Sequence, residues 1–237
     1  MRTLRKLNIL GAIAALLSTT LLLGSCVSDD DNNPVNPTAP TALVTFIGNR
    51  TSGTAENSVT RSYFELLTTE NHAFTLYSTA ETALQGEKYK DGQRMVLTYQ
   101  PTQGQGVLAD GEVQIMRAPV LVWTSEVETA TTEEAQAANA PMHVMAINRT
   151  GNYINLEARL PYYTEREYSI LLDESTAGSD MPELYVTTTA KGYPQGTTTS
   201  DIASFDITTV WRNPAISGIK IHINNTGSTQ QVYNFLK

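Results

Sequence analysis

The alternation of apolar and polar side chains along almost the whole chain after Thr41 is the feature that most limits its fold. Apolar residues at every second position belong to strands that bury one face, and they do not form the wider stripe of an amphipathic helix. Residues 93–100 give the clearest alternation in the first half of the chain. The pattern predicts an all-β protein.

Strand-like runs in the first half are separated by turns rich in glycine, asparagine and aspartate. Residues 62–67 and 72–77 flank a short turn and predict a hairpin, whereas residues 50–60 form a polar loop. Pro119 predicts a bulge, a bend or a sheet edge. Five strands in about 80 residues predict a small barrel over residues 42–125. The runs cover residues 43–47, 62–67, 72–77, 93–100 and 112–123.

The second half repeats the strand pattern over residues 142–237, again with turn residues between the runs. About seven short strands in about 95 residues fit an antiparallel β-sandwich. The runs cover residues 143–148, 153–160, 167–172, 184–189, 204–210, 219–223 and 231–236.

Residues 126–141 differ from both halves because they are acidic and rich in helix formers. Thr131 precedes Glu133 and Glu134, which is the order expected of a helix cap followed by a negatively charged first turn. We therefore predict a polar linker with about two helical turns between the two β-domains.

The first 25 residues have the composition of an export signal. Three basic residues precede an uncharged, mainly apolar run over residues 7–23, and the small residues Gly24 and Ser25 follow. Signal peptides have this order of charged, apolar and small residues and are removed from the mature protein. The alternative is a transmembrane helix, but polar residues at Asn8 and 18–20 interrupt a run that needs about 20 apolar residues.

Cys26 follows Leu23, Gly24 and Ser25, and this segment resembles the bacterial lipobox. The resemblance implies that the thiol of Cys26 receives a diacylglyceryl group and that the new amino terminus is acylated, for example with palmitate. The membrane would then be a partner through the lipid. Cys26 is the chain's only cysteine, so an intramolecular disulfide is excluded, and a small buried core residue is the alternative.

The residues that follow the cysteine indicate on which face of the outer membrane the lipoprotein is displayed. Ser28, Asp29, Asp30 and Asp31 resemble the acidic export signal of surface lipoproteins in Gram-negative anaerobes, which implies display outside the outer membrane. The alternative is that the aspartates only keep the tether solvated. Proline recurs up to Pro40, so we expect an extended tether over residues 26–41.

The charge distribution argues against nucleic acid as a partner. The chain has 16 Lys and Arg against 24 Asp and Glu, and much of the acidity lies in the tether and in residues 126–141. Residues 42–125 hold six basic and eight acidic side chains. Neither β-domain has the basic stripe that neutralises phosphates.

No pattern of residues predicts an enzyme, a metal site or a cofactor. His72, His143 and His222 lie in separate strand runs, without the spacing of metal ligands, and there is no Gly-x-Ser-x-Gly elbow. We expect these histidines to be ordinary strand residues.

Aromatic residues near predicted strand ends carry the one indication of binding. These are Trp123, Tyr162, Tyr163 and Trp211. Exposed rings there would stack on sugars, since an aromatic ring presents a large rigid face. The alternative is that they close the ends of the barrel or the sandwich.

Taken together, the two halves resemble the NigD-like lipoproteins from Thr41 onward. The resemblance implies an OB-like barrel followed by an immunoglobulin-like antiparallel sandwich, and it supplies no catalytic residues. OB barrels bind oligonucleotides or oligosaccharides on one sheet face. The resemblance depends on residues 62–66, 73–76, 90–99, 153–159, 168–173, 183–186 and 204–207.

Three functions remain open on the sequence. The first is a non-enzymatic binding or accessory module on the outer membrane, exposed at the cell surface, for a glycan, peptide or protein ligand. The second is a structural subunit that assembles by exchanging its last strand, residues 230–236. The third is a hydrolase whose site is assembled only in three dimensions.

Overall fold

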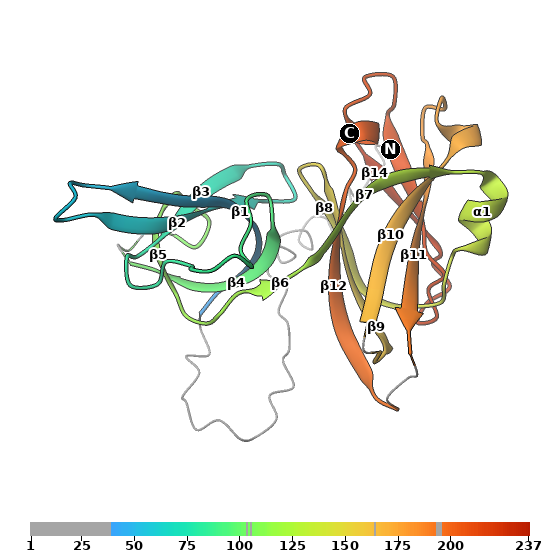
Figure 1. Cartoon of the computed structure of the whole chain (residues 1–237). Coiled ribbons are helices and arrows are strands. Elements are labelled where there is room, and N and C mark those ends of the chain that lie inside the picture. Colours follow the sequence, from blue (N-terminus) through green and yellow to red (C-terminus); the bar gives the residue numbers. More distant parts are fainter. Residues whose placement is uncertain (1–38, 103, 105, 164, 193–195) are drawn as a thin grey trace, which may run out of the picture.

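The computed structural model describes residues 39–102, 104, 106–163, 165–192 and 196–237. These residues form two β-units, a barrel and a sandwich, that lie side by side (Figure 1). The all-β fold expected from the alternation is confirmed. The leader, Cys26 and the acidic run from Ser28 to Asp31 lie outside the described residues.

The first unit is a closed barrel. Its strands are β1 (Thr41–Ser52), β2 (Val59–Leu67), β3 (Ala73–Ser78), β4 (Arg94–Pro101), β5 (Gly111–Ile115) and the short β6 (Val120–Leu121). They follow the order β1-β2-β3-β5-β4, and β4 pairs back onto β1. Only β3 and β5 are parallel, so the unit has the OB-like arrangement that was expected.

Strand β1 closes the barrel because it is long and bent. Its first residues pair with β4 and its later residues with β2, and the register shifts between Phe46 and Asn49. Gly48 lies at this bulge with φ +101°, a conformation that side chains rarely adopt, and an added Cβ would lie 3.0 Å from Asp91. Beyond the bulge, β1 and β2 extend as a hairpin away from the sandwich, where a polar loop was expected (Figure 1).

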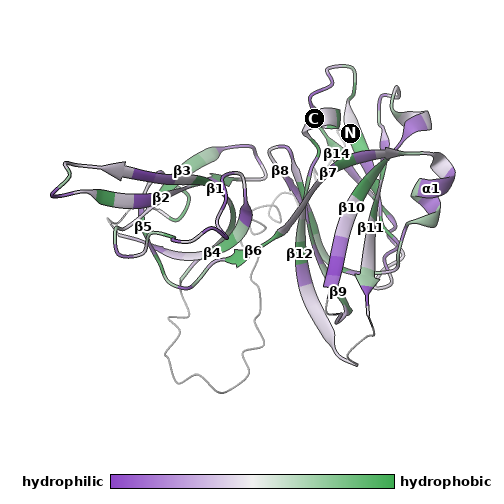
Figure 2. Ribbon diagram, viewed as in Figure 1, coloured by the Kyte–Doolittle hydropathy of each residue, from purple (hydrophilic) through white to green (hydrophobic). Residues whose placement is uncertain are grey.

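The second unit is a sandwich with a small share of helix. Its elements are β7 (Trp123–Ala130), α1 (Thr132–Ala137), β8 (His143–Thr150), β9 (Tyr153–Pro161), β10 (Glu165–Asp173), the 3-10 turn η1 (Glu174–Thr176), β11 (Glu183–Lys191), β12 (Thr198–Asp206), α2 (Thr208–Trp211), β13 (Gly218–His222) and β14 (Val232–Leu236). One sheet has the order β8-β9-β12-β7 and the other β7-β10-β11-β13-β14. Hydrophobic and hydrophilic residues alternate along the strands (Figure 2).

Strand β7 joins the two sheets. Residues 123–126 run parallel to β12, and residues 127–130 run parallel to β10. A third parallel pair, β11 with β13, lies further along the second sheet, and the other pairs in the sandwich are antiparallel. The predicted sandwich is therefore confirmed, with three parallel pairs that the sequence did not indicate.

The segment 126–141 is part of the sandwich, whereas the sequence suggested a linker. Glu126 and Glu128 lie on the exposed face of β7, and Val127 between them packs against the core. The acidic side chains therefore belong to the solvent-exposed face of a strand. The predicted helix is present as α1, with Thr131 and Glu134 forming a capping box. The two units are separated only by Val122, which is buried.

The run 204–210 divides between two elements. It ends β12 at Asp206, whose carboxylate accepts the backbone N–H of Thr208 and so starts α2. The last run forms β14, which pairs with β13 of the same chain and lies at the sheet edge.

A buried arginine ties the barrel to the sandwich. Arg94 of β4 is fully buried, and its guanidinium donates to Thr45 Oγ1 of the barrel (3.0 Å) and to Asn155 Oδ1 of the sandwich (3.2 Å). It also lies 4.5 Å from the ring centroid of Tyr153. Burial lowers the pKa of Arg94 to about 10, so the side chain remains charged at neutral pH.

Asn155 connects this arginine to three strands of the sandwich. Its Oδ1 also accepts from Ser204 Oγ (2.8 Å), and its Nδ2 donates to Asn148 Oδ1 (3.0 Å) and Thr150 Oγ1 (2.9 Å). Every polar atom of the Asn155 side chain therefore has a partner, as a group that is 3% exposed requires.

A second contact joins a turn of each unit. Asn71, between β2 and β3, accepts from Arg149 Nη1 (2.9 Å) and from the backbone N–H of Gly151 (3.1 Å). Gly151 has φ +56°, and an added Cβ would lie 2.7 Å from Leu67. The two units therefore contact each other through the β2–β3 turn of the barrel and the β8–β9 turn of the sandwich, as well as through Arg94.

We predict that Asn155→Ala lowers the free energy of unfolding by about 3 kcal/mol, because it removes one of the two hydrogen-bond partners of the buried Arg94 guanidinium and the hydrogen bonds to Asn148, Thr150 and Ser204. Urea unfolding of the purified chain measures this loss. The control is Asn234→Ala on the exposed face of β14, which should change stability by less than about 0.5 kcal/mol. Similar losses in both variants would show that the Asn155 network does not stabilise the junction.

Candidate functional site

The structure does not bring the four predicted aromatic residues together. Trp211, in α2, follows the end of β12, whereas Tyr162 and Tyr163 lie beside the start of that strand. Nine residues of strand separate these ends by about 27 Å. Trp123 pairs with Ala203 between the two positions.

Three of these rings take part in contacts that stabilise the sandwich or its junction. Trp211 lies 4.4 Å from the guanidinium of Arg149, and Tyr163 lies 5.1 Å from that of Arg166. Trp123 Nε1 donates to the carbonyl oxygen of Tyr168 at 2.7 Å. Their geometry favours the closing of sandwich ends over a shared platform.

Tyr168 is buried beneath Trp123 and donates its hydroxyl to Asp201 Oδ2 (2.7 Å). Burial, followed by this hydrogen bond and the nearby carboxylate, raises the pKa of Tyr168. Arg166 Nε lies 3.6 Å from the same Asp201 oxygen. These groups link β10 to β12 at one end of the sandwich.

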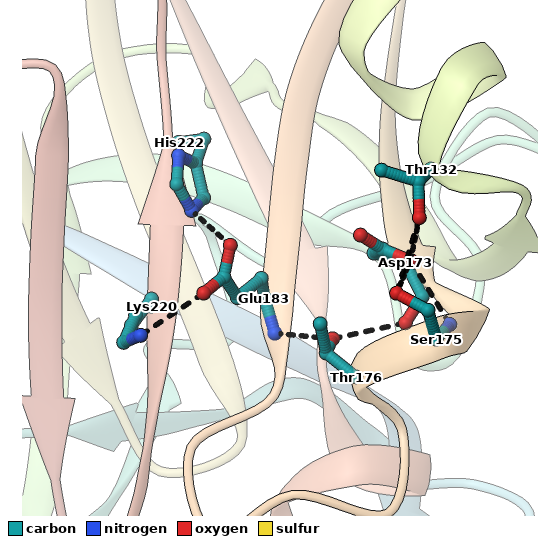
Figure 3. Close-up of polar contacts among 7 residues, drawn as sticks. All are labelled: Thr132, Asp173, Ser175, Thr176, Glu183, Lys220 and His222. Atoms are coloured by element: carbon teal, nitrogen blue, oxygen red, sulfur yellow. Dashed lines mark hydrogen bonds and ion pairs between the residues drawn. The ribbon is translucent and has the colours of Figure 1, made fainter.

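The three histidines lie apart, and one belongs to a polar cluster on the sandwich. His222 Nε2 lies 3.0 Å from Glu183 Oε2, and Lys220 Nζ lies 2.9 Å from Glu183 Oε1 (Figure 3). The His222 ring stacks on Tyr185 at 4.4 Å. Among the residues that the structure describes, no three potential ligands gather around a point where a metal ion would bind.

The same cluster continues to Asp173, which holds η1 and α1. Its Oδ1 accepts from Ser175 Oγ (2.7 Å), from the Ser175 N–H (2.9 Å) and from Thr132 Oγ1 (2.7 Å) (Figure 3). The hydroxyl of Ser175 thus donates to a carboxylate, and among the described residues no hydrogen bond joins it to an imidazole. This geometry caps turns.

A better candidate for binding lies on the outer face of the barrel. Tyr63 of β2 and Tyr77 of β3 are direct cross-strand partners, with ring centroids 5.7 Å apart and planes inclined by 31°. The guanidinium of Arg50 lies 4.4 Å from the Tyr63 ring, and that of Arg61 lies 5.3 Å from the Tyr77 ring. We call these four residues the tyrosine platform.

Strand alternation explains why the platform faces outward. Phe64 and Leu66 of β2 and Leu76 of β3 fill the barrel core, so the side chains one position earlier or later point to the other face. Tyr63 and Tyr77 are half-buried and leave part of each ring accessible. The sequence signal was a pair of tyrosines within the predicted hairpin, and sequence reasoning missed it.

The two arginines of the platform have different surroundings. Arg61 pairs with Glu112 of β5 and is fixed against the sheet. Arg50 is exposed, and among the described residues its guanidinium forms no ion pair, so its donors can reach a ligand. The platform therefore offers two neighbouring tyrosine rings, each with a guanidinium over it, and these groups suit the C–H faces and the hydroxyl or carboxylate groups of a sugar.

Comparisons with known proteins establish the fold. No family model matches the chain, and no curated protein matches it. Solved structures do, among them a protein of unknown function (DUF1344) from Bacteroides vulgatus, with 14% identity, a TM-score of 0.57 and coverage of 82% of this chain and 90% of that one.

Two further solved structures share the arrangement. A "Putative lipoprotein" from Bacteroides fragilis has 13% identity, a TM-score of 0.52 and coverage of 83% and 96% of the two chains. A NigD-like immunity protein from Bacteroides caccae has 14% identity, a TM-score of 0.51 and coverage of 85% and 99%. The resemblance to NigD-like proteins is thus confirmed for the fold.

Among the described residues, no helix is both long enough and apolar enough to cross a bilayer.

We predict that Asp173→Asn makes the sandwich less stable at neutral pH and less sensitive to acid. Hydrogen bonds from Ser175 and Thr132 hold the pKa of Asp173 below its usual value. The carboxylate therefore contributes stability above about pH 4, and this contribution is lost as the pH falls through the lowered pKa. Urea unfolding between pH 7 and pH 2 measures the free energy of unfolding of the wild type and of the Asp173→Asn variant. The same pH dependence in both proteins would contradict the prediction.

Proposed function

We propose that this chain is a non-enzymatic, lipid-anchored binding module on the outer membrane surface, and that it binds a glycan through the tyrosine platform. The observation that carries the glycan assignment is the cross-strand pair of Tyr63 and Tyr77 with an available arginine beside it. Such a pair binds the flat faces of sugar rings at little entropic cost, because each ring is already held by its strand.

The charge around the platform favours a glycan over a nucleic acid. Arg61 is balanced by Glu112, and Glu65 follows Tyr63 on the same face of β2. Of the two platform arginines, Arg50 is the one that forms no ion pair among the described residues. A polyanion needs several such cations for affinity, whereas a neutral or singly acidic sugar does not.

A binding role also agrees with how the reactive groups of the sandwich are arranged. His222 stacks on Tyr185 and lies against Glu183, and Ser175 donates to Asp173. These groups take their neighbours from within the fold. The proposal of a non-enzymatic module rests on this arrangement.

Display at the surface rests on the leader, on the lipobox-like segment ending at Cys26 and on Asp29 to Asp31. A solved protein of the same fold bears the name "Putative lipoprotein", which supports the anchoring of this chain. The β1–β2 hairpin belongs to the barrel and extends away from the sandwich, so a ligand can approach this part of the barrel (Figure 1).

We predict that Tyr63→Ala and Tyr77→Ala each weaken glycan binding at least about tenfold, or about 1.4 kcal/mol, because each removes one stacking face. An array of neutral and acidic oligosaccharides identifies the glycan that binds most strongly, and titration with that glycan measures the variants. Arg50→Gln should weaken the binding only of glycans that carry a carboxylate.

The matched control is Tyr162→Ala, which removes a ring that is 45% exposed on the sandwich, more than either platform tyrosine. It should leave the affinity unchanged. A blank array, or equal losses in the Tyr63 and Tyr162 variants, would reject the platform as the binding surface.

We predict that a membrane-impermeant amine label reacts with this chain on intact cells. Replacing Asp29, Asp30 and Asp31 by alanine should reduce labelling while the total amount in the membrane fraction stays constant, because the acidic run directs export and the lipid retains the chain. Cys26→Ser should instead release it from that fraction. If the wild-type chain is not labelled on intact cells but is labelled fully after lysis, surface display is excluded.

A further inference from the structure

A cavity lies between the barrel and the sandwich, on the side of the junction formed by β1 and the end of β2. Its volume is about 260 Å³, close to the lower end of small-molecule sites at about 300 Å³. Both units contribute to its wall, so it exists only while the junction holds them together.

Most of the cavity wall is aliphatic. Leu43, Leu66 and Leu67 come from the barrel strands, and Val107 and Leu108 come from the segment between β4 and β5. Val107 is 41% exposed and Leu108 45% exposed, so apolar surface also borders the opening. An aliphatic chain that covered these side chains would remove their exposed surface from water.

The sandwich supplies one polar region of the wall, and that region offers hydrogen-bond donors. Asn148 and Thr150 both use an oxygen to accept from Asn155 Nδ2. Among the described residues, neither Asn148 Nδ2 nor the hydroxyl hydrogen of Thr150 has an acceptor. The free groups at this position therefore require an acceptor from a ligand or from water.

Among the described residues that line the cavity, none is ionisable at neutral pH, and Arg94 is not part of the wall but donates to Asn155, which is. A carboxylate placed there would lose its hydration without direct contact with a cation, which is costly, whereas a neutral carbonyl would gain two donors at a small cost. We infer that the cavity binds the acyl group of a lipid ester or amide, with its carbonyl oxygen at Asn148 and Thr150 and its chain along the leucines.

This site is separate from the tyrosine platform, and its test is independent of the glycan proposal. The chain is studied with Cys26→Ser, so that no detergent competes for the cavity. Isothermal titration at pH 8 compares methyl octanoate with octanoate. We expect methyl octanoate to bind, and octanoate to bind at least tenfold more weakly because its charge has no partner.

Asn148→Asp is the decisive variant. It keeps an oxygen for Asn155 Nδ2 but replaces the free donor by an acceptor, so methyl octanoate should bind at least tenfold more weakly. Asn234→Asp, the same change on the exposed face of β14, is the matched control and should have no effect. Leu108→Trp places a larger side chain at the opening, where Leu108 is half-exposed, and should abolish binding. This variant leaves Asn148 and Thr150 unchanged, so it tests the cavity independently of the polar region.

Absence of binding by methyl octanoate, or unchanged binding in both the Asn148→Asp and the Leu108→Trp variants, overturns the site. Equal affinity for octanoate and its methyl ester overturns the neutral acyl assignment. Thermal unfolding of each variant confirms that it is folded at the temperature of the titration.

Discussion

The buried guanidinium of Arg94 is the interaction on which the arrangement of this protein depends. A charged group removed from water needs hydrogen-bond partners, and Arg94 finds one in each unit, Thr45 and Asn155, while its Nε has no acceptor among the described residues. Asn155 in turn uses all its polar atoms. The barrel and the sandwich are therefore held in one orientation.

This fixed junction separates two surfaces of different character. The tyrosine platform belongs to the barrel alone and needs only the pairing of β2 with β3. The acyl cavity has walls from both units and requires that they stay together. The fold is shared with proteins of about 14% identity and different names, so any function of this chain comes from side chains placed on that fold.

Much of the fold follows from local pattern. Alternating side chains indicated five strands before residue 125 and all seven strands after residue 142, and the cap at Thr131 indicated α1. The acidic residues 126–130 were harder to interpret, because glutamates on the solvent-exposed face of a strand give the segment the same acidic composition that a linker has. Their place in β7 depends on parallel pairing with β10 and β12, which are distant in sequence.

The sequence by itself determined that this is an all-β chain of two units, because side-chain alternation is a local property of strands. It also indicated a hairpin that contains Tyr63 and Tyr77, but only the register of the pairing makes the two rings neighbours. The contact between Arg94 and Asn155 spans 61 residues and has no local signal. Tertiary structure decided the junction, the cavity and the platform, because each of them arises where strands from separate parts of the chain meet.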